Sequence, residues 1–272
     1  MSSISSLGVK DKFYEELISV FKTNPSNYNS VDSKSITTSA DREIKTHLIW
    51  PTLDTVRNSN KGYISGGSIP AKYKELYIDE TSRELKPVIK ETLYKWDGSV
   101  SGRERIMPHM KCYFAYSLTH VNTLKRKLTT CEYKILVIKN QIKYNKSSED
   151  MNINLSWFLL TSANLSMAAW GTKQSKMEKL YIKSYELGVL FLPEKIFTNK
   201  RSFSCTPDHP ILGVDIKKSE AEAEFETVEF PLPFKFPPIP YDLKSKSDDD
   251  RPWVWDRDYS HFPDRFGRTS CF

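Results

Sequence analysis

Two residues that stand two positions apart, His109 and Lys111, carry side chains that could do chemistry together. Residues 105–113 are predicted to form a short strand, and strand side chains alternate between two faces. His109 and Lys111 are therefore expected on one face, with Met110 and Cys112 on the other. An imidazole beside a fixed ammonium group can hold a phosphate and move a proton to or from its ester oxygen. The alternative is an exposed strand face that carries two polar residues and has no chemical role.

A second stretch, residues 156–171, offers polar groups that could complete such a site. The apolar run from Trp157 to Leu160 stops at small and hydroxyl-bearing residues, and a helix is expected to begin near Asn164 to Ser166. The backbone N–H groups of the first turn of that helix would face an anion.

A strand with His-x-Lys (residues 109–111), followed by Ser-x-Asn (residues 162–164) at the end of another strand, resembles the pattern of the phospholipase D superfamily. The sites of that superfamily bind a phosphodiester without a metal. The flanking residues resemble the C-terminal half of the tyrosyl-DNA phosphodiesterases more specifically. The segments that carry this resemblance are residues 107–111, 161–166, 168–171 and 184–193. It extends over nearly the whole chain through residues 2–8, 66–70, 240–243 and 250–255.

The resemblance implies a phospholipase D-like α/β fold, a mixed β-sheet sandwiched between helices. Residues 1–272 would form one C-terminal domain, one of the two halves of a pseudo-symmetric enzyme, and the chain would begin inside that domain. His109 and Lys111 are expected on one central strand, with Asn164 just past the end of the adjacent strand.

The resemblance implies hydrolysis of the phosphodiester that links a tyrosine to a DNA 3′ end, the adduct left by a stalled type I topoisomerase. One histidine attacks phosphorus and forms a phosphohistidine, while another protonates the leaving phenolate and then activates water. By position His109 would be the acid and base. Lys111 and Asn164 would neutralise charge on the phosphate oxygens, and Glu186 would orient a histidine of the other half. No metal or other cofactor is expected.

The same resemblance assigns residues to two sides of the substrate. Ser3, Ser6, Ser68 and Ser166 would line a groove for single-stranded DNA, whereas Pro70 and Trp255 would lie on the side of the topoisomerase-derived peptide. The alternatives are an N-terminal tail that caps a helix, for Ser3 and Ser6, and a structural tryptophan, for Trp253 or Trp255.

His109 is the only histidine that is followed two residues later by lysine, so the nucleophilic half of such a site is missing from this sequence. The N-terminal half of the same enzyme is therefore the expected protein partner. Two alternatives remain: a nucleic-acid-binding fragment without turnover, and another phospholipase D relative that acts on lipids or on nucleic acids generally.

The composition agrees with a nucleic-acid partner but does not require one. The 272 residues carry a formal net charge of +6, which suits a polyanion only mildly. The four cysteines form no Cys-x-x-Cys pair, and the sequence has no signal peptide and no long apolar run that would cross a membrane. A reducing compartment is expected, and the resemblance specifies the nucleus.

Several other elements are predicted from periodicity and composition. Phe13, Leu17 and Phe21 lie at helical spacing, residues 47–51 form a short buried strand, and residues 85–96 form a helix that ends near Gly98. The glycines of residues 62–70 would let backbone amides approach a phosphate. Residues 180–193 are expected to form a strand pair in the core, where Glu186 would need a partner. Residues 118–148 form a basic insertion, either a hairpin near the active cleft or an inert loop.

Overall fold

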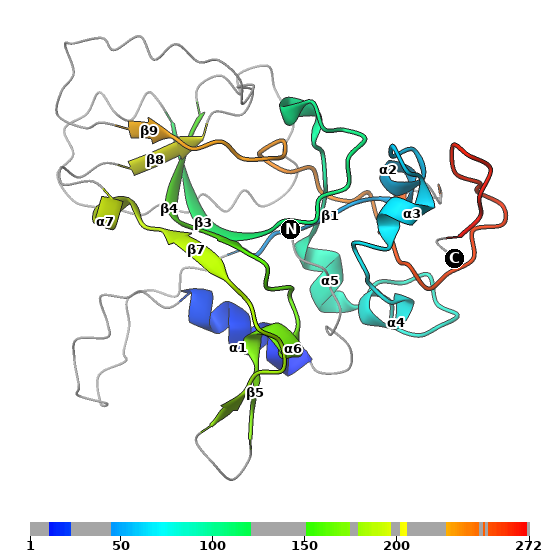
Figure 1. The fold of residues 1–272 in the computed structure, drawn as a ribbon, viewed down its shortest axis with the longest axis horizontal. Coiled ribbons are helices and arrows are strands. Elements are labelled where there is room, and N and C mark those ends of the chain that lie inside the picture. Colours follow the sequence, from blue (N-terminus) through cyan, green and yellow to red (C-terminus); the bar gives the residue numbers. More distant parts are fainter. Residues whose placement is uncertain are drawn as a thin grey trace.

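The computed structural model describes residues 11–22, 45–120, 151–174, 179–196, 202–205, 227–244, 247 and 250–270. Figure 1 shows a larger β-sheet and, beside it, a group of short helices and loops against which the C-terminal segment lies. The predicted contacts of Ser3 and Ser6, and nearly all of the basic insertion, lie outside the described residues. None of the described helices is long and apolar enough to cross a membrane.

The larger sheet contains β3 (Lys111–His120), β4 (Met151–Thr161), β7 (Gly188–Phe191), β8 (Ser202–Cys205) and β9 (Thr227–Glu229). Its order is β3-β4-β8-β9, and β7 also pairs with β4. The β8–β9 pair is parallel and the other pairs are antiparallel, so the predicted mixed sheet is confirmed. β3 begins at Lys111 and His109 precedes it, so the prediction that His109 and Lys111 share one strand is wrong.

The sequence of β4 explains why it lies at the centre of the sheet. Ile153, Leu155 and Phe158 are buried, and aromatic and β-branched residues suit a strand that is covered on its faces. Phe158 also lies in a cluster of rings, 5.8 Å from Phe114 and 4.5 Å from Phe230 between ring centroids.

One helix packs against the aromatic residues of this sheet. α1 (Asp11–Lys22) carries its apolar residues at helical spacing, as predicted, and Leu17 is buried. The ring of Phe21 lies 5.5 Å from that of Trp157 and 5.6 Å from that of Tyr113. The predicted sandwich, with helices on both faces of the sheet, and its arrangement as half of a larger enzyme stay predictions.

A second, parallel sheet joins β1 (Leu48–Trp50) to β2 (Leu93–Lys95). β1 confirms the strand predicted at residues 47–51. The helix predicted over residues 85–96 is shorter, because α5 (Pro87–Thr92) ends where Leu93 pairs with Leu48. The short helices near this sheet are α2 (Leu53–Arg57), α3 (Tyr63–Gly66), α4 (Tyr73–Leu76) and η2 (Ser99–Ser101).

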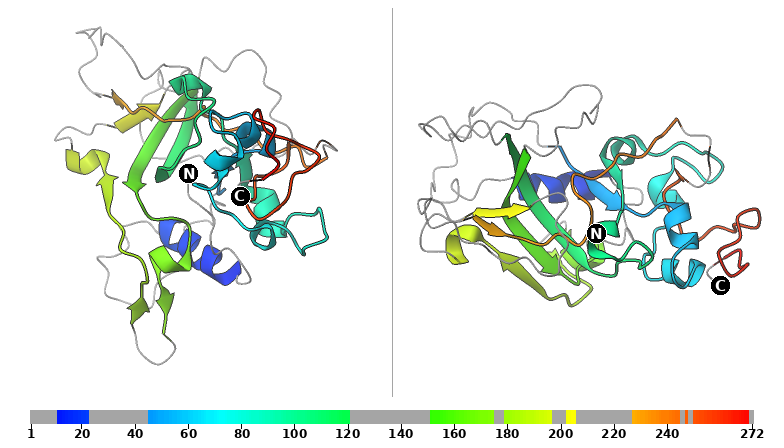
Figure 2. Two further views of the ribbon diagram at one scale, coloured as in Figure 1. Left: turned by 45° about the vertical axis from the view of Figure 1, so that its right-hand side comes forward. Right: turned by 90° about the horizontal axis from the view of Figure 1, so that it is seen from above.

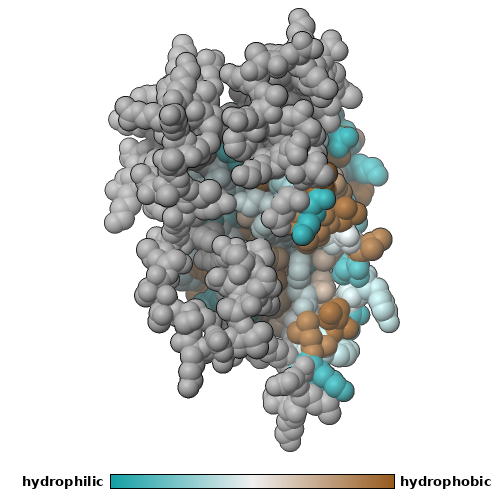
Figure 3. Space-filling view, turned by 90° about the vertical axis from the view of Figure 1, so that its left-hand side faces the viewer, coloured by the Kyte–Doolittle hydropathy of each residue, from teal (hydrophilic) through white to brown (hydrophobic). Residues whose placement is uncertain are grey.

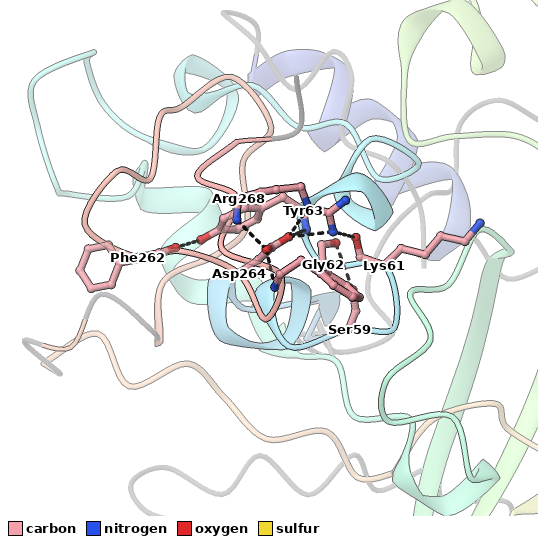
Figure 4. Close-up of polar contacts among 8 residues, drawn as sticks. Ser59, Lys61, Gly62, Tyr63, Phe262, Asp264 and Arg268 are labelled. Atoms are coloured by element: carbon pink, nitrogen blue, oxygen red, sulfur yellow. Dashed lines mark hydrogen bonds and ion pairs between the residues drawn. The ribbon is translucent and has the colours of Figure 1, made fainter.

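The C-terminal segment is fixed against α3 by a polar network (Figure 4). The Asp264 carboxylate accepts hydrogen bonds from the Tyr63 N–H and from the Arg268 side chain, both at 3.0 Å. Arg268 also donates to the Lys61 carbonyl, and the Tyr63 hydroxyl donates to the carbonyl of Phe262. Trp253, which is fully buried, packs against Gly66 at the end of α3.

Gly66 is needed for this packing, because a side chain at this position would overlap Trp253. A Cβ atom at Gly66 would lie 2.2 Å from the indole of Trp253, whereas a Cβ at Gly67 would meet nothing closer than the Ile64 carbonyl at 3.5 Å. The Gly66 carbonyl accepts a hydrogen bond from Trp253 Nε1 at 3.3 Å. Gly66 therefore allows close contact with a tryptophan, and the predicted approach of the loop amides to a phosphate stays a prediction.

The prediction that residues 180–193 lie in the core is wrong. These residues include β6 (Leu180–Tyr181), which pairs with β5 (Thr172–Lys173), then β7, and α7 (Pro193–Ile196). Their apolar side chains are largely exposed: Tyr185 is fully exposed and Leu187 is 83% exposed. Figure 3, which views the side of the molecule where β7 lies in Figure 1, shows apolar residues at the surface between hydrophilic ones. A strand that pairs on one edge and leaves its side chains in solvent has a surface suited to a partner.

Candidate active site

Three segments that are distant in sequence meet at one end of β4. β3 begins at Lys111, β4 ends at Thr161, and these two residues are paired directly across the sheet. On the other side of β4, Thr161 pairs with Gly188, the first residue of β7. A Cβ atom at Gly188 would lie 2.9 Å from Thr161 Cβ, so a glycine is needed for this approach. The pairing brings the segments that contain His109, Asn164 and Glu186 to the same end of the sheet.

Lys111 is a buried cation at this edge, only 6% exposed. Burial lowers the pKa of Lys111, and the nearby carboxylate of Glu186 opposes that effect and raises it. A cation that water solvates poorly interacts strongly with an anion that approaches it. Lys111 is therefore suited to hold a phosphate oxygen.

His109 precedes the strand instead of lying in it. The strand predicted over residues 105–113 begins only at Lys111, and His109 is exposed in the irregular segment just before it. A side chain in this position can exchange protons with a ligand or with water. A cavity of about 160 Å³ lies beside it, lined mainly by apolar residues that include Trp96, Met107 and Phe234.

Glu186 has the partner that its charge requires, although it is exposed rather than buried. The Ser162 hydroxyl donates a hydrogen bond of 2.5 Å to Glu186 Oε2 and accepts one of 3.1 Å from the Leu187 N–H. The backbone N–H of Ser162 donates to the Leu187 carbonyl at 3.0 Å. Ser162 was not among the predicted site residues, yet it fixes the position of Glu186. The available signal was its place as the serine of the Ser-x-Asn pattern.

Asn164 and Ser166 lie in the turn that leads from β4 to α6 (Met167–Trp170). Asn164 is half-buried, three residues past the end of β4, and this position agrees with the prediction. Ser166 is buried, and its hydroxyl accepts a hydrogen bond from the Ala169 N–H as the N-cap of α6. This position does not present the Ser166 hydroxyl to a groove, and one amide of the first turn is already satisfied by the cap.

The remaining predicted contact residues lie in the region of α3 and the C-terminal segment. Ser68 is exposed, and its hydroxyl donates to the Ser65 carbonyl at 2.8 Å. Pro70 and Trp255 are both half-buried. The Trp255 N–H donates a hydrogen bond of 3.0 Å to the carbonyl of Ala71, the residue that follows Pro70. The structure thus brings the two predicted peptide-side residues together. In the part of the chain that the structure describes, no group of three or more His, Cys, Asp or Glu side chains is placed to bind a metal.

Comparisons with known proteins agree with the resemblance that the sequence carries. The family model described as tyrosyl-DNA phosphodiesterase matches residues 1–242. Tyrosyl-DNA phosphodiesterase 1 of Arabidopsis thaliana is 33% identical over 229 residues, which are 78% of this chain and 30% of that protein. The Drosophila melanogaster protein of the same name is 30% identical over 212 residues, 77% of this chain and 26% of that protein.

A solved structure, that of the yeast tyrosyl-DNA phosphodiesterase, aligns with 79% of this chain and 38% of its own length, at 22% identity and a TM-score of 0.43. The chain spans about a third of the length of the curated relatives that it matches. Because the family model matches most of the chain, the chain belongs to the tyrosyl-DNA phosphodiesterase family.

Proposed function

We propose that this chain supplies the acid–base half of a phosphodiesterase site that removes tyrosyl groups from DNA 3′ ends. The observation that carries the proposal is the meeting of β3, β4 and β7 at one edge. There an exposed histidine, a buried lysine and an anchored glutamate surround the end of β4. Membership of the family specifies the reaction class.

The chemistry follows from the positions of these groups. A nucleophilic histidine outside this chain attacks phosphorus and forms a P–N bond, while His109 gives a proton to the tyrosyl oxygen as the P–O bond breaks. His109 then takes a proton from water, whose oxygen attacks phosphorus as the P–N bond breaks, which frees the nucleophilic histidine and leaves a phosphate on the DNA 3′ end. Lys111 and Asn164 stabilise the charge on the non-bridging oxygens during both steps.

The missing nucleophile is best explained by a protein partner, the N-terminal half of the same enzyme. Residues 180–190 expose a group of apolar side chains next to Glu186, a carboxylate that is accessible to a histidine from outside the chain. Exposed apolar surface of this kind marks protein–protein contacts. With the partner in place, Glu186 would accept a hydrogen bond from the nucleophilic histidine and set its orientation.

The substrate contacts proposed for the complete site are mainly to phosphate and peptide. The DNA 3′ end would lie as a single strand near Ser68, with Ser3 and Ser6 as further contacts, and the topoisomerase I-derived peptide would lie near Pro70 and Trp255. Such phosphate contacts depend on salt and little on base sequence. The setting for this repair function is the nucleus.

A second candidate is a nucleic-acid-binding fragment without turnover. One observation favours it, since the 272 residues contain a single His-x-Lys pair. A 3′-phosphotyrosyl oligonucleotide incubated with the pure chain separates the two. No cleavage alone, with cleavage restored by a separately expressed N-terminal half of a family member, supports the half-site. Binding without cleavage in every mixture would support the fragment.

A further inference from the structure

Tyr113 lies on β3 two residues after Lys111, in the regular part of the β3–β4 ladder. Side chains two positions apart on a strand point to the same face, so Tyr113 shares a face of the sheet with that buried lysine. The Tyr113 hydroxyl donates a hydrogen bond of 3.0 Å to the carbonyl of Ala163. Ala163 immediately precedes Asn164. A side chain of the strand that begins at Lys111 therefore holds the turn that carries Asn164.

Both backbone groups of Ala163 are hydrogen-bonded. Its N–H donates to Thr161 Oγ1 at 3.1 Å, and its carbonyl accepts from Tyr113. The next carbonyl, that of Asn164, accepts from the Ser166 N–H at 2.8 Å. The bonds from Ala163 and Ser166 are local, because each joins residues two positions apart in the chain. The bond from Tyr113 joins residues 50 positions apart and ties the turn to β3.

Aromatic contacts hold the ring of Tyr113 in place. It meets the ring of Trp170 edge-on, with centroids 5.2 Å apart and planes at 82°, and it lies 5.6 Å from the ring of Phe21. The rings of Phe21 and Trp170 also meet edge-on, at 5.4 Å. Figures 1 and 2 show α1, drawn in blue, beside α6, drawn in green. A ring packed in this way has little rotamer freedom, so its hydroxyl is in place before a ligand binds.

The two groups assigned to the non-bridging phosphate oxygens come from different segments. Lys111 begins β3, whereas Asn164 lies three residues past Thr161, the residue that pairs with Lys111. The strand pairing alone therefore does not fix Asn164. Stabilisation of developing charge needs groups that are already in position, and a misplacement of about 1 Å can cost about 100-fold in rate.

We propose that Tyr113 is a positioning residue of the candidate active site, which sets the place of Asn164 relative to Lys111. This inference rests on the proposed function, because it gives Tyr113 a part in the same phosphate site. Tyr113 itself needs no contact with the phosphate, since its ring packs against other rings and its hydroxyl is directed to the Ala163 carbonyl. It acts through Asn164, which contributes most when the charge on the phosphate oxygens is greatest.

Tyr113→Phe removes the hydroxyl and keeps the ring, so it separates the hydrogen bond from the aromatic packing. Tyr73→Phe is the matched control, because the Tyr73 hydroxyl also donates to a backbone carbonyl, that of Ser82 at 2.6 Å, and Tyr73 belongs to α4, outside the candidate site. Urea denaturation should show a small and similar decrease in the midpoint for both variants. Amide hydrogen exchange should differ: the N–H groups of Ala163 and Ser166 should exchange about fivefold faster in Tyr113→Phe and at the unmodified rate in Tyr73→Phe.

Steady-state kinetics of the reconstituted enzyme with a 3′-phosphotyrosyl oligonucleotide test the link to catalysis. Tyr113→Phe should lower kcat at least about tenfold and change KM less than about threefold, because the lost placement matters most in the transition state. In a chain that already carries Asn164→Ala, the addition of Tyr113→Phe should change kcat less than about twofold, since the group through which Tyr113 acts is gone. Tyr73→Phe should match the unmodified chain in kcat and KM.

Three outcomes would overturn the inference: unchanged exchange at Ala163 and Ser166, equal kcat for Tyr113→Phe and Tyr73→Phe, or the same fold-decrease from Tyr113→Phe with and without Asn164. Failure of the proposed function has a different signature, because the unmodified chain would then show no turnover in any mixture. The exchange measurement needs no turnover, and it decides whether Tyr113 fixes the turn in that case as well.

Discussion

Lys111 combines two opposed electrostatic effects at one position. Its burial disfavours the charged form, whereas Glu186 favours it, and Ser162 keeps that carboxylate in place with a hydrogen bond of 2.5 Å. A lysine held in this way is costly for folding and useful for binding an anion. Substitution should therefore separate stability from function.

Lys111→Met tests this separation. The apolar side chain of similar length should leave the free energy of unfolding unchanged or raise it by about 1 kcal/mol, because no buried charge remains. Affinity for an oligonucleotide with a 3′-phosphate should fall about tenfold, since a charge-assisted hydrogen bond is lost. Urea denaturation and fluorescence anisotropy measure the two quantities. A loss of more than about 2 kcal/mol in stability would show that the charge is structural.

His47 provides a pH dependence of stability. Its imidazole is hydrogen-bonded at Nδ1 to the Tyr116 hydroxyl, 3.0 Å away, and lies over the Tyr94 ring. Burial, with a smaller effect of the Lys45 charge, lowers the pKa of His47 to about 4. The unfolded chain, with a pKa of about 6.5, binds the proton more readily. Stability is therefore fully present above pH ~6.5 and falls as the pH drops from there towards 4.

The decrease in the free energy of unfolding caused by protonation of His47 should be about 3 kcal/mol at most. Urea denaturation at pH 7 and pH 4.5 measures this decrease. In His47→Gln, which keeps a polar group but does not titrate, the difference in stability between the two pH values should shrink. An equal difference in both proteins would contradict this role of His47.

At the scale of elements, the C-terminal segment and α3 depend on one close contact. Trp253 is fully buried against Gly66, and the hydrogen bonds around Asp264 hold the following residues on α3. Pro70 and Trp255 flank this contact, so its loss would displace the residues proposed to face the peptide.

Gly66→Ala should destabilise the chain by about 1–3 kcal/mol, because the added methyl group would overlap the Trp253 indole. Gly67→Ala is the control one position away, where the added methyl group meets only the Ile64 carbonyl at an ordinary distance. Thermal denaturation compares the two variants. Equal stability of both would contradict the packing at Gly66.

Sequence patterns predicted the elements whose periodicity is local. α1 follows the spacing of its apolar residues, and the core of β4 follows its apolar run. The end of α5 could not be predicted in the same way, because Leu93 leaves the helix to pair with Leu48, a residue far away in the chain. The candidate site was predicted in part. The family motifs named His109, Lys111, Asn164 and Glu186. The role of Ser166 as a buried helix cap and the hydrogen bond from Ser162 to Glu186 could be seen only in the structure.

The exposure of residues 180–190 explains the largest error at the scale of the whole molecule. Their apolar side chains predict a core strand pair, and in this chain they lie at the surface. The apolar composition of residues 180–190 and their exposure in this chain are compatible if the proposed N-terminal half of the enzyme covers these side chains.

Leu187→Asp tests the partner surface. Leu187 is 83% exposed, so the change should alter the stability of the isolated chain by less than about 0.5 kcal/mol. It should weaken association with a separately expressed N-terminal half at least about tenfold, because a charge would be buried at the contact. Phe266→Asp, at another exposed apolar residue, is the control and should associate normally. Equal association of both variants, measured by analytical ultracentrifugation, would contradict this surface.

The most direct test concerns the role of His109 in the reconstituted enzyme. The chain with His109→Asn is mixed with an N-terminal half and a 3′-phosphotyrosyl oligonucleotide, and intact-mass spectrometry follows the N-terminal half. Because asparagine cannot activate water, DNA covalently bound to the histidine of that half should accumulate, while the unmodified chain should release the product. Release of the product at the unmodified rate, without an adduct at any time point, would contradict the assignment of His109 as the acid and base.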